Sequence, residues 1–359
     1  MFPNSSTSQM EYVMKLGPQR RIGAIASVIV AAALVLSGCS TASAPEATSA
    51  SGLPVKTIGV WQSQASGDGE KQTLSAIQAA ADAVGWKTVV TDSNGDPKAM
   101  ASTMQSLITQ KVDAILTVYV ATGLIAPQLK AAKAAGIPVI SVGYQGTPTD
   151  DLTAEYAPDQ AEQTTMLLKR MGEDLPNGGT VAPLAVAGYY GIDQEVDTLK
   201  SEAGTYKFTP LERVDVPVTD IFGGTTSAAV DVLNANPDLA ALFTTLDIGA
   251  QSAVPALTQT GRDVPIYSFG AIPGSLAFVR TGEVTLVTSD GAKSGFIAVD
   301  ALLDYWVNGT AIPKTTPTED AFEYTIVDKT TAPADGTEVY PEADFAKPFL
   351  DKWKTEYKI

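Results

Sequence analysis

The sequence predicts an α/β protein built from two doubly wound parallel sheets. Short apolar runs alternate with longer runs of helical periodicity, first over residues 55–143 and again over 180–307. Strands that alternate with helices of this length are typical of βαβ units, which place the strands in a parallel sheet. The strand segments, such as 114–116 and 138–140, are almost wholly apolar, as expected where helices cover both faces. The chain of 359 residues is long enough for two such domains.

The elements follow one another in two series, separated by the turn at Asn177, Gly178 and Gly179. The first series has expected strands at 55–61, 87–91, 114–120 and 138–143, and helices at 71–84, 97–110 and 127–135. The second has strands at 180–186, 209–214, 239–245, 265–268 and 285–288, and helices at 227–236, 250–260, 274–280 and 294–307. The tail from residue 328 contains two prolines and a closing helix over 343–357.

The N-terminus predicts an exported protein. Arg20 and Arg21 precede the uncharged run 22–36, which is the arrangement of a secretory leader over residues 1–38. The run ends at Leu36-Ser37-Gly38-Cys39, which resembles the lipobox of bacterial lipoproteins and makes Cys39 the expected lipid anchor on the outer face of the cytoplasmic membrane. The alternative is a transmembrane anchor, but the uncharged stretch lies near the lower length limit for spanning. The small polar residues of 39–54 predict a flexible tether.

Composition excludes several classes of function. The net charge is −16, so the chain lacks the clustered cations that neutralise the phosphates of nucleic acid. It has no histidine, which removes imidazole general bases, Ser-His-Asp triads and histidine-ligated metals. Its single cysteine is assigned to lipid, so no disulfide is expected. No phosphate-binding glycine motif follows a strand. We therefore expect neither an enzyme nor a protein with a cofactor or bound metal.

Six runs carry a resemblance to a known family. They are, in chain order, 56–60, 92–97, 110–116, 134–140, 157–160 and 236–243 with Asp247. Together they resemble the type I periplasmic solute-binding proteins of the ribose- and galactose-binding group, over roughly residues 55–310. The resemblance implies an ABC importer receptor whose partners are a small ligand and the membrane permease subunits, and which acts as a monomer. A ligand-sensing partner of a membrane kinase is an open alternative.

The resemblance also implies the domain layout. Two Rossmann-like lobes are joined by a three-segment hinge, with crossings near Asp159, near Asp290 and after Asn308, and close on ligand by rotating about it. The N-terminal lobe comprises 55–157 and 291–309, and the C-terminal lobe 158–290 and 310–359. Asp159 is the expected hinge residue, although an Asp at such a crossing can instead cap a helix.

Loops that follow the strands should line a cleft between the lobes, because ligands bind beyond the carboxyl ends of strands in open α/β sheets. These loops are rich in aromatic, amide and carboxylate side chains, which suit the apolar faces and hydroxyl groups of a sugar. The candidate ligand-binding residues are Gln62, Gln64, Tyr119, Tyr144, Tyr189, Asp193, Phe222, Asp247 and Asp290. Trp61 is expected at the cleft edge, with a place in the core as the alternative.

The charges of these loops favour a neutral ligand. Lys293 is their only basic residue, so a ligand carboxylate or phosphate would lack its best partner. A sugar or polyol is expected, and a cationic small molecule or a nucleoside is the alternative, because tyrosines and carboxylates can cage an ammonium group. Where sugar binders of this group carry an Arg, this chain has Asp193, and it has Gly270 where they have a residue such as Asp. These departures make an ordinary pyranose less suited to the site.

Overall fold

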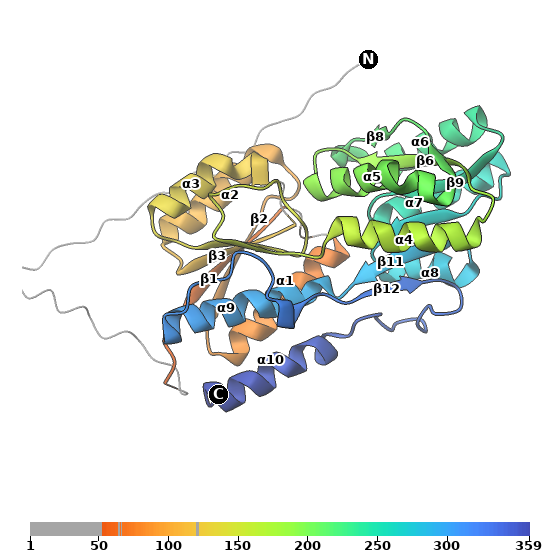
Figure 1. Cartoon of the computed structure of the whole chain (residues 1–359). Coiled ribbons are helices and arrows are strands. Elements are labelled where there is room, and N and C mark those ends of the chain that lie inside the picture. The colour runs from red at the N-terminus through yellow and green to blue at the C-terminus, as the bar shows by residue number, and fades with distance from the viewer. Residues whose placement is uncertain (1–51, 64, 66, 120–121) are drawn as a thin grey trace, which may run out of the picture. The chain divides into compact units, whose positions relative to one another are not determined.

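The computed structural model describes residues 52–359 apart from 64, 66, 120 and 121 (Figure 1). The predicted leader, the lipid anchor Cys39, residues 39–51 of the tether and Gln64 lie outside the described residues. The rest of the predicted tether differs from expectation, because Leu53 is 6 % exposed and packs in the core of the first lobe. The Trp86 indole N–H also donates to the Pro54 carbonyl at 3.0 Å, so the ordered body begins before residue 55.

The first sheet has five parallel strands in the order β2-β1-β3-β4-β5. The strands are β1 (Thr57–Gln62), β2 (Lys87–Asp92), β3 (Ala114–Val118), β4 (Val139–Val142) and β5 (Ala154–Tyr156). Its helices are α1 (Asp68–Ala83), α2 (Pro97–Gln110), α3 (Ala126–Ala134), α9 (Ser294–Asn308) and α10 (Glu342–Glu356). Local signals fix the helix ends: the Asp96 carboxylate accepts a bond from the Lys98 N–H and so caps α2.

The second sheet has the order β12-β11-β10-β9-β6-β7, with β8 also paired to β6. All of its pairings are parallel except β11 with β12. The strands are β6 (Gly179–Val186), β7 (Phe208–Pro210), β8 (Val214–Val216), β9 (Leu239–Thr244), β10 (Ile266–Phe269), β11 (Val284–Ser289) and β12 (Tyr324–Val327). Its helices are α4 (Gln160–Asp174), α5 (Tyr190–Glu202), α6 (Ile221–Ala235), α7 (Asp247–Thr260) and α8 (Pro273–Thr281). The strand expected at 209–214 is thus divided into β7 and β8.

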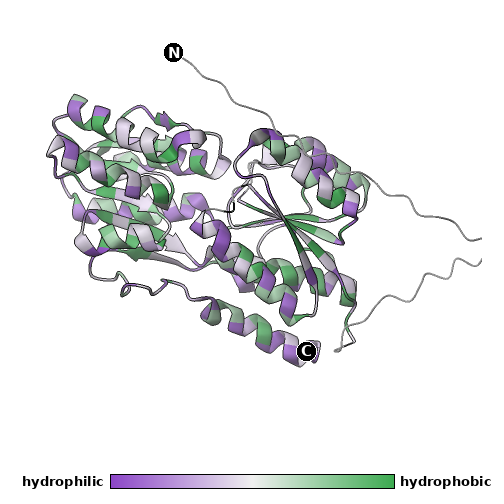
Figure 2. Cartoon of the chain, turned by 180° about the vertical axis from the view of Figure 1, so that it is seen from behind, coloured by the Kyte–Doolittle hydropathy of each residue, from purple (hydrophilic) through white to green (hydrophobic). Residues whose placement is uncertain are grey.

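Helices cover both faces of each sheet, as the apolar strands predict. On the first sheet, α1, α9 and α10 pack on one face, and α2 and α3 on the other. On the second, α6, α7 and α8 pack on one face, and α4 and α5 on the other. Figure 2 shows the hydrophobic colouring concentrated on the strands and on the helix sides that face them. No helix in the described part of the chain is long and apolar enough to cross a membrane.

The chain passes between the two lobes four times. Three passages lie near the crossings that the family resemblance implies: between β5 and α4, between β11 and α9, and between α9 and β12. The fourth was not expected. After β12 the chain returns to the first lobe, where Phe349 and Trp353 of α10 are buried against Phe296 of α9. The assignment of the whole of 310–359 to the C-terminal lobe is therefore wrong for α10, whose apolar face completes the first core.

Candidate functional site

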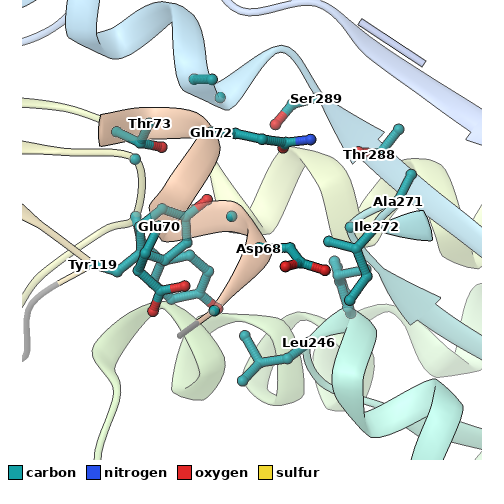
Figure 3. Close-up of a pocket in the computed structure, with 18 of the residues that line it drawn as sticks. Asp68, Glu70, Gln72, Thr73, Tyr119, Leu246, Ala271, Ile272, Thr288 and Ser289 are labelled. Carbon is teal, nitrogen blue, oxygen red and sulfur yellow. The ribbon is translucent and has the colours of Figure 1, made fainter. Parts of the chain in front are cut away.

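A cavity of about 480 Å³ lies where the carboxyl ends of the strands of the two lobes meet. Its size falls within the range of small-molecule sites. Both lobes, the passages between them and the C-terminal tail contribute to its lining. Figure 3 shows side chains of α1, in the first lobe, close to Leu246 and Ile272, which belong to the second lobe.

The first-lobe wall is polar. It consists mainly of the first turns of α1 and two tyrosines, with the lining residues Asp68, Glu70, Gln72, Thr73, Tyr119 and Tyr144. Two glycines flank the opening of α1, and Gly67 at its N-cap supplies no side-chain bond to the helix. The Asp68 carboxylate pairs with Lys71 at 2.9 Å. Helix α1 therefore presents carboxylate, amide and hydroxyl groups to the cavity.

Tyr119 and Tyr144 are held together by the backbone around them. Tyr119 has a φ of 53°, and its ring stacks on Tyr144 with the centroids 5.8 Å apart. Gly143 has a φ of 88°, and a Cβ there would come within 2.6 Å of the Tyr119 ring. Glycine is therefore required at 143 both for its conformation and for the position of the aromatic pair.

The Tyr144 hydroxyl joins the two lobes. It donates to Glu195 Oε1 on α5 at 2.7 Å, and the Glu195 side chain is fully buried. Burial raises the pKa of Glu195 to about 8, although the Tyr144 bond and the charge of Arg213 oppose the shift. Burial also raises the pKa of the Tyr144 phenol, so this hydroxyl keeps its proton.

The second-lobe wall has a large apolar part. The apolar and aromatic lining residues lie at or after the ends of β6, β9 and β10, or in the first turns of α6 and α7. They are Tyr189, Ile221, Phe222, Leu246, Ile248, Phe269, Ala271 and Ile272. Phe222 is 56 % exposed, so its ring has surface available to a ligand. Gln251 of α7 adds an amide, and Thr288 and Ser289 at the end of β11 add hydroxyl groups. This wall offers contact area rather than charge.

The segments between the lobes close the back of the cavity. Gln160 and Gln163 of α4 line it together with Asp290. Asp290 is 4 % exposed, pairs with Lys293 at 2.7 Å and accepts a bond from the Glu323 N–H. Its charge is therefore already compensated by protein groups. Asp159 instead caps α4, accepting bonds from the Ala161 and Glu162 N–H groups, and its side chain does not line the cavity.

Five of the predicted ligand-binding residues line the cavity: Tyr119, Tyr144, Tyr189, Phe222 and Asp290. Two do not. Gln62 is buried beneath it, with its Nε2 donating to the Glu70 carbonyl at 3.4 Å. Asp193 is paired with Arg213 outside the cavity, because α5 turns its first-turn carboxylate toward β8. Asp247 opens α7, but its side chain, like Gln64, lies outside what the structure describes.

The expectation that Trp61 lies at the cleft edge is wrong. Its side chain is fully buried among residues of α2 and α3, and its indole N–H donates to Thr103 Oγ1 at 2.8 Å. Sequence reasoning also missed several lining residues, namely Glu70, Gln72, Gln160, Gln163, Glu338 and Tyr340. Glu70 and Gln72 lie on α1, which begins at Asp68, earlier than the sequence predicts. The glycines at 67 and 69 were the signal for this earlier start.

The cavity carries an acidic set of charges. Its carboxylates are Asp68, Glu70, Asp290 and Glu338, and no Lys or Arg is among the described residues that line it. Within the described part of the chain, no three histidine, cysteine or carboxylate side chains are grouped closely enough to hold a metal ion. The site is thus suited to hydrogen bonding with neutral groups, or to a cation.

Comparison with known proteins places these features in context. The sequence matches the family described as "Periplasmic binding protein domain" over residues 58–310. It is 24 % identical over 236 residues to the ribose import binding protein of Bacillus subtilis, covering 64 % of this chain and 75 % of that one. It is 28 % identical over 235 residues to a xylitol-binding protein of Mycolicibacterium smegmatis, covering 62 % and 64 %.

Solved structures share the fold. An ABC transporter solute-binding protein of Agrobacterium vitis with bound allitol has a TM-score of 0.69 at 20 % identity, covering 77 % of this chain and 96 % of that one. A solute-binding protein of Mycobacterium smegmatis with bound glycerol has a TM-score of 0.69 at 23 % identity, covering 80 % and 99 %. At these identities the likeness shows two lobes of the same architecture.

Proposed function

This chain belongs to the periplasmic binding protein family, and from that premise we propose that it is the extracytoplasmic receptor of an ABC importer for a sugar or polyol. The observation that carries the proposal is the cavity between the lobes, where tyrosines and amides meet an apolar wall and no Lys or Arg is present among the described lining residues. Polyols need planar hydrogen-bonding groups for vicinal hydroxyls and apolar surface for their C–H faces.

The names of similar proteins agree with this ligand class. The curated relatives are named for ribose and xylitol, and the solved neighbours hold allitol, tagatopyranose and glycerol. Their ligands are all small, neutral and rich in hydroxyl groups. The family resemblance also supports permease subunits as the membrane partner and a transport role without catalysis.

A second candidate ligand is a polyol that carries an amine, or another small cation. The carboxylates of Asp68, Glu70 and Glu338 favour it, because they line the same cavity with no cation among the described lining residues. Stacked Tyr119 and Tyr144 would add aromatic surface for an ammonium group. A nucleoside, whose base could rest on the same rings, is a further member of this second class.

A ligand panel tests the proposal. Purified protein would be heated alone and with ribose, xylitol, allitol, glucosamine, choline, adenosine and succinate, and positive ligands titrated by calorimetry. A ligand at about 100 times its Kd stabilises the folded state by about 2.7 kcal/mol. We expect the largest shift with a neutral polyol or sugar. A preference for succinate, or no shift with any compound, would contradict the proposal, whereas a preference for choline or glucosamine would favour the second candidate.

We further propose that Cys39 carries the lipid that holds the receptor at the outer face of the membrane. The lipobox-like run that precedes it supports this placement. After export, the Cys39→Ala variant should be absent from the membrane fraction and should partition into the aqueous phase rather than the detergent phase. Continued detergent partitioning of that variant would mean that another feature anchors the chain.

A further inference from the structure

The segment that follows β12 leads to an inference about the ligand site. We define the strap as residues 328–341, which join β12 of the second lobe to α10 of the first. The family match ends at residue 310, so the strap lies outside the part of the chain that the family describes. It is also the fourth passage between the lobes, beyond the three that the family resemblance implies.

The first part of the strap is fixed to the second lobe. Asp328 accepts a charged bond from Arg170 of α4 at 2.5 Å, and Thr330 and Thr331 bond to the same carboxylate. Asp335 pairs with Arg280 of α8 at 2.9 Å. Val339, near the end of the strap, also packs on the core of the second lobe. These contacts come from two helices and the core, so they hold the course of the strap along this lobe.

The last part of the strap is fixed to the first lobe. Glu338 Oε1 accepts a bond from Gln72 Nε2 of α1 at 3.2 Å. Directly after the strap, Glu342 accepts a bond from the Ser75 hydroxyl of α1 at 3.1 Å. Phe345 then packs edge-on against Phe296, with the ring centroids 6.0 Å apart. The strap therefore spans the two lobes at the position of α1, whose first turns form the polar wall.

Near its end the strap also faces the cavity. Glu338, Val339 and Tyr340 all line it, as does Gln72, to which Glu338 is bonded. The Tyr340 side chain is half-buried, and its pKa is raised by burial and by the charges of Asp290 and Glu323. Tyr340 therefore keeps its proton and can donate a hydrogen bond. Glu338 supplies acceptors beside it.

We propose that the strap is part of the ligand site and that Glu338 and Tyr340 are specificity-determining residues that hydrogen-bond hydroxyl groups of a bound polyol or sugar. This rests on the proposed function, in which the cavity is the receptor's ligand site. A carboxylate accepts from two neighbouring hydroxyls at once, and a phenol donates to a third. The pair thus favours ligands with hydroxyls at the end of the cavity where the strap passes.

Paired conservative substitutions test this. Glu338→Gln keeps an oxygen for the Gln72 bond but removes the charge, and Tyr340→Phe removes only the hydroxyl. The matched controls are Glu342→Gln and Asp335→Asn, which alter strap anchors that do not line the cavity. Each variant and the unmodified protein would be titrated with ribose, xylitol, allitol and glucosamine. Thermal midpoints without ligand would check the fold.

We expect each of the two test substitutions to weaken the best neutral ligand roughly 3- to 30-fold and to change the order of preference among the probes. The controls should stay within about twofold of the unmodified protein. If the unmodified protein binds and the two test variants bind as well as it does, the strap proposal is overturned and the proposed function stands. Equal losses in test and control variants would also overturn it, because they would indicate a purely structural role. If the unmodified protein binds none of the probes, the proposed function itself fails.

Discussion

The two walls of the cavity differ in chemistry. The first lobe contributes carboxylates, an amide and hydroxyls, mostly from the opening turns of one helix, α1. The second lobe contributes aliphatic and aromatic side chains, mostly from loops that follow different strands, together with uncharged polar groups of Gln160, Gln163, Gln251, Thr288 and Ser289. A single rigid helix fixes the directions of several polar groups together, whereas separate loops can adjust their apolar contacts independently. The first wall is therefore suited to selecting hydroxyl patterns, and the second to excluding water from them.

The largest effect is expected where the walls join, at the buried pair Tyr144–Glu195. The pKa of Glu195 is raised from 4.5 to about 8 in the folded protein, so folding binds a proton between these values. Its contribution to stability is fully present below about pH 4.5 and is lost as pH rises through about 8. The free energy of unfolding should therefore fall by at most about 5 kcal/mol over this range, at 1.36 kcal/mol per pKa unit.

Denaturant unfolding at several pH values measures this effect. The Glu195→Gln variant should lose stability less steeply than the unmodified protein between pH 5 and about 8.5, since its amide cannot ionise. Tyr144→Phe is the companion variant, because it removes the hydrogen bond and leaves the buried carboxyl in place. Parallel pH curves for Glu195→Gln and the unmodified protein would show that Glu195 does not titrate in this range.

A change at Gly143 should disturb the polar wall alone. Gly143→Ala places a Cβ within 2.6 Å of the Tyr119 ring at a φ of 88°. We expect a stability loss of roughly 3 kcal/mol, from backbone strain plus the clash, together with weaker ligand binding. Gly136→Ala is the matched control, because Gly136 has a φ of 71° but nothing within 4 Å of the added carbon. The control should lose about 1 to 2 kcal/mol and keep its affinity. Equal losses of stability and of affinity in the two variants would mean that the contact with the Tyr119 ring contributes to neither.

The apolar wall is tested at Phe222. Phe222→Ala should weaken ligand binding roughly tenfold, about 1.4 kcal/mol, because the ring covers the ligand only in the complex. The stability of the unliganded protein should change by less than about 0.5 kcal/mol. Leu124→Ala is the control: Leu124 is 55 % exposed, against 56 % for Phe222, but lies outside the cavity. Calorimetric titration that finds equal affinities for the two variants would remove Phe222 from the site.

The smallest effect is expected at Asp193. Asp193→Asn should leave ligand affinity within about twofold, because this carboxylate is bonded to Arg213 and does not line the cavity. Loss of the ion pair with Arg213 should reduce the free energy of unfolding by no more than about 1 kcal/mol, as for other ion pairs at the surface. A large fall in affinity would restore Asp193 to the ligand site and would contradict the position of α5 relative to the cavity.

Sequence reasoning places a residue at the cavity where its position follows from its place after a strand. Tyr119, Tyr144 and Tyr189 each follow a parallel strand closely, and the carboxyl ends of such strands meet at one edge. Trp61 is the second-last residue of β1, but the alternation of side chains turns it toward α2 and α3, and both faces of this sheet are covered. Strand periodicity alone cannot distinguish a buried face from a cleft edge when both are apolar.

The residues that were missed lie where no periodic pattern identifies the site. Gln72 belongs to a helix whose start the sequence placed too late. Gln160 and Gln163 lie on the inner side of α4, among other polar residues of similar type. Glu338 and Tyr340 reach the cavity only because α10 packs on the first lobe. That packing depends on the shape of a core that no local pattern describes.

The attachment of α10 also affects the order in which the lobes can fold. Most of the second sheet is formed by one continuous stretch, from α4 to β11, with only β12 added from beyond it. The core of the first lobe, in contrast, contains Leu53 from one end of the described chain and Trp353 and Tyr357 from the other. Contacts so distant in sequence form slowly, and domains that are continuous in sequence can fold as they are synthesised. We therefore expect the second lobe to reach its native packing first. The first lobe can complete its core only after α10 has been synthesised and has packed on it.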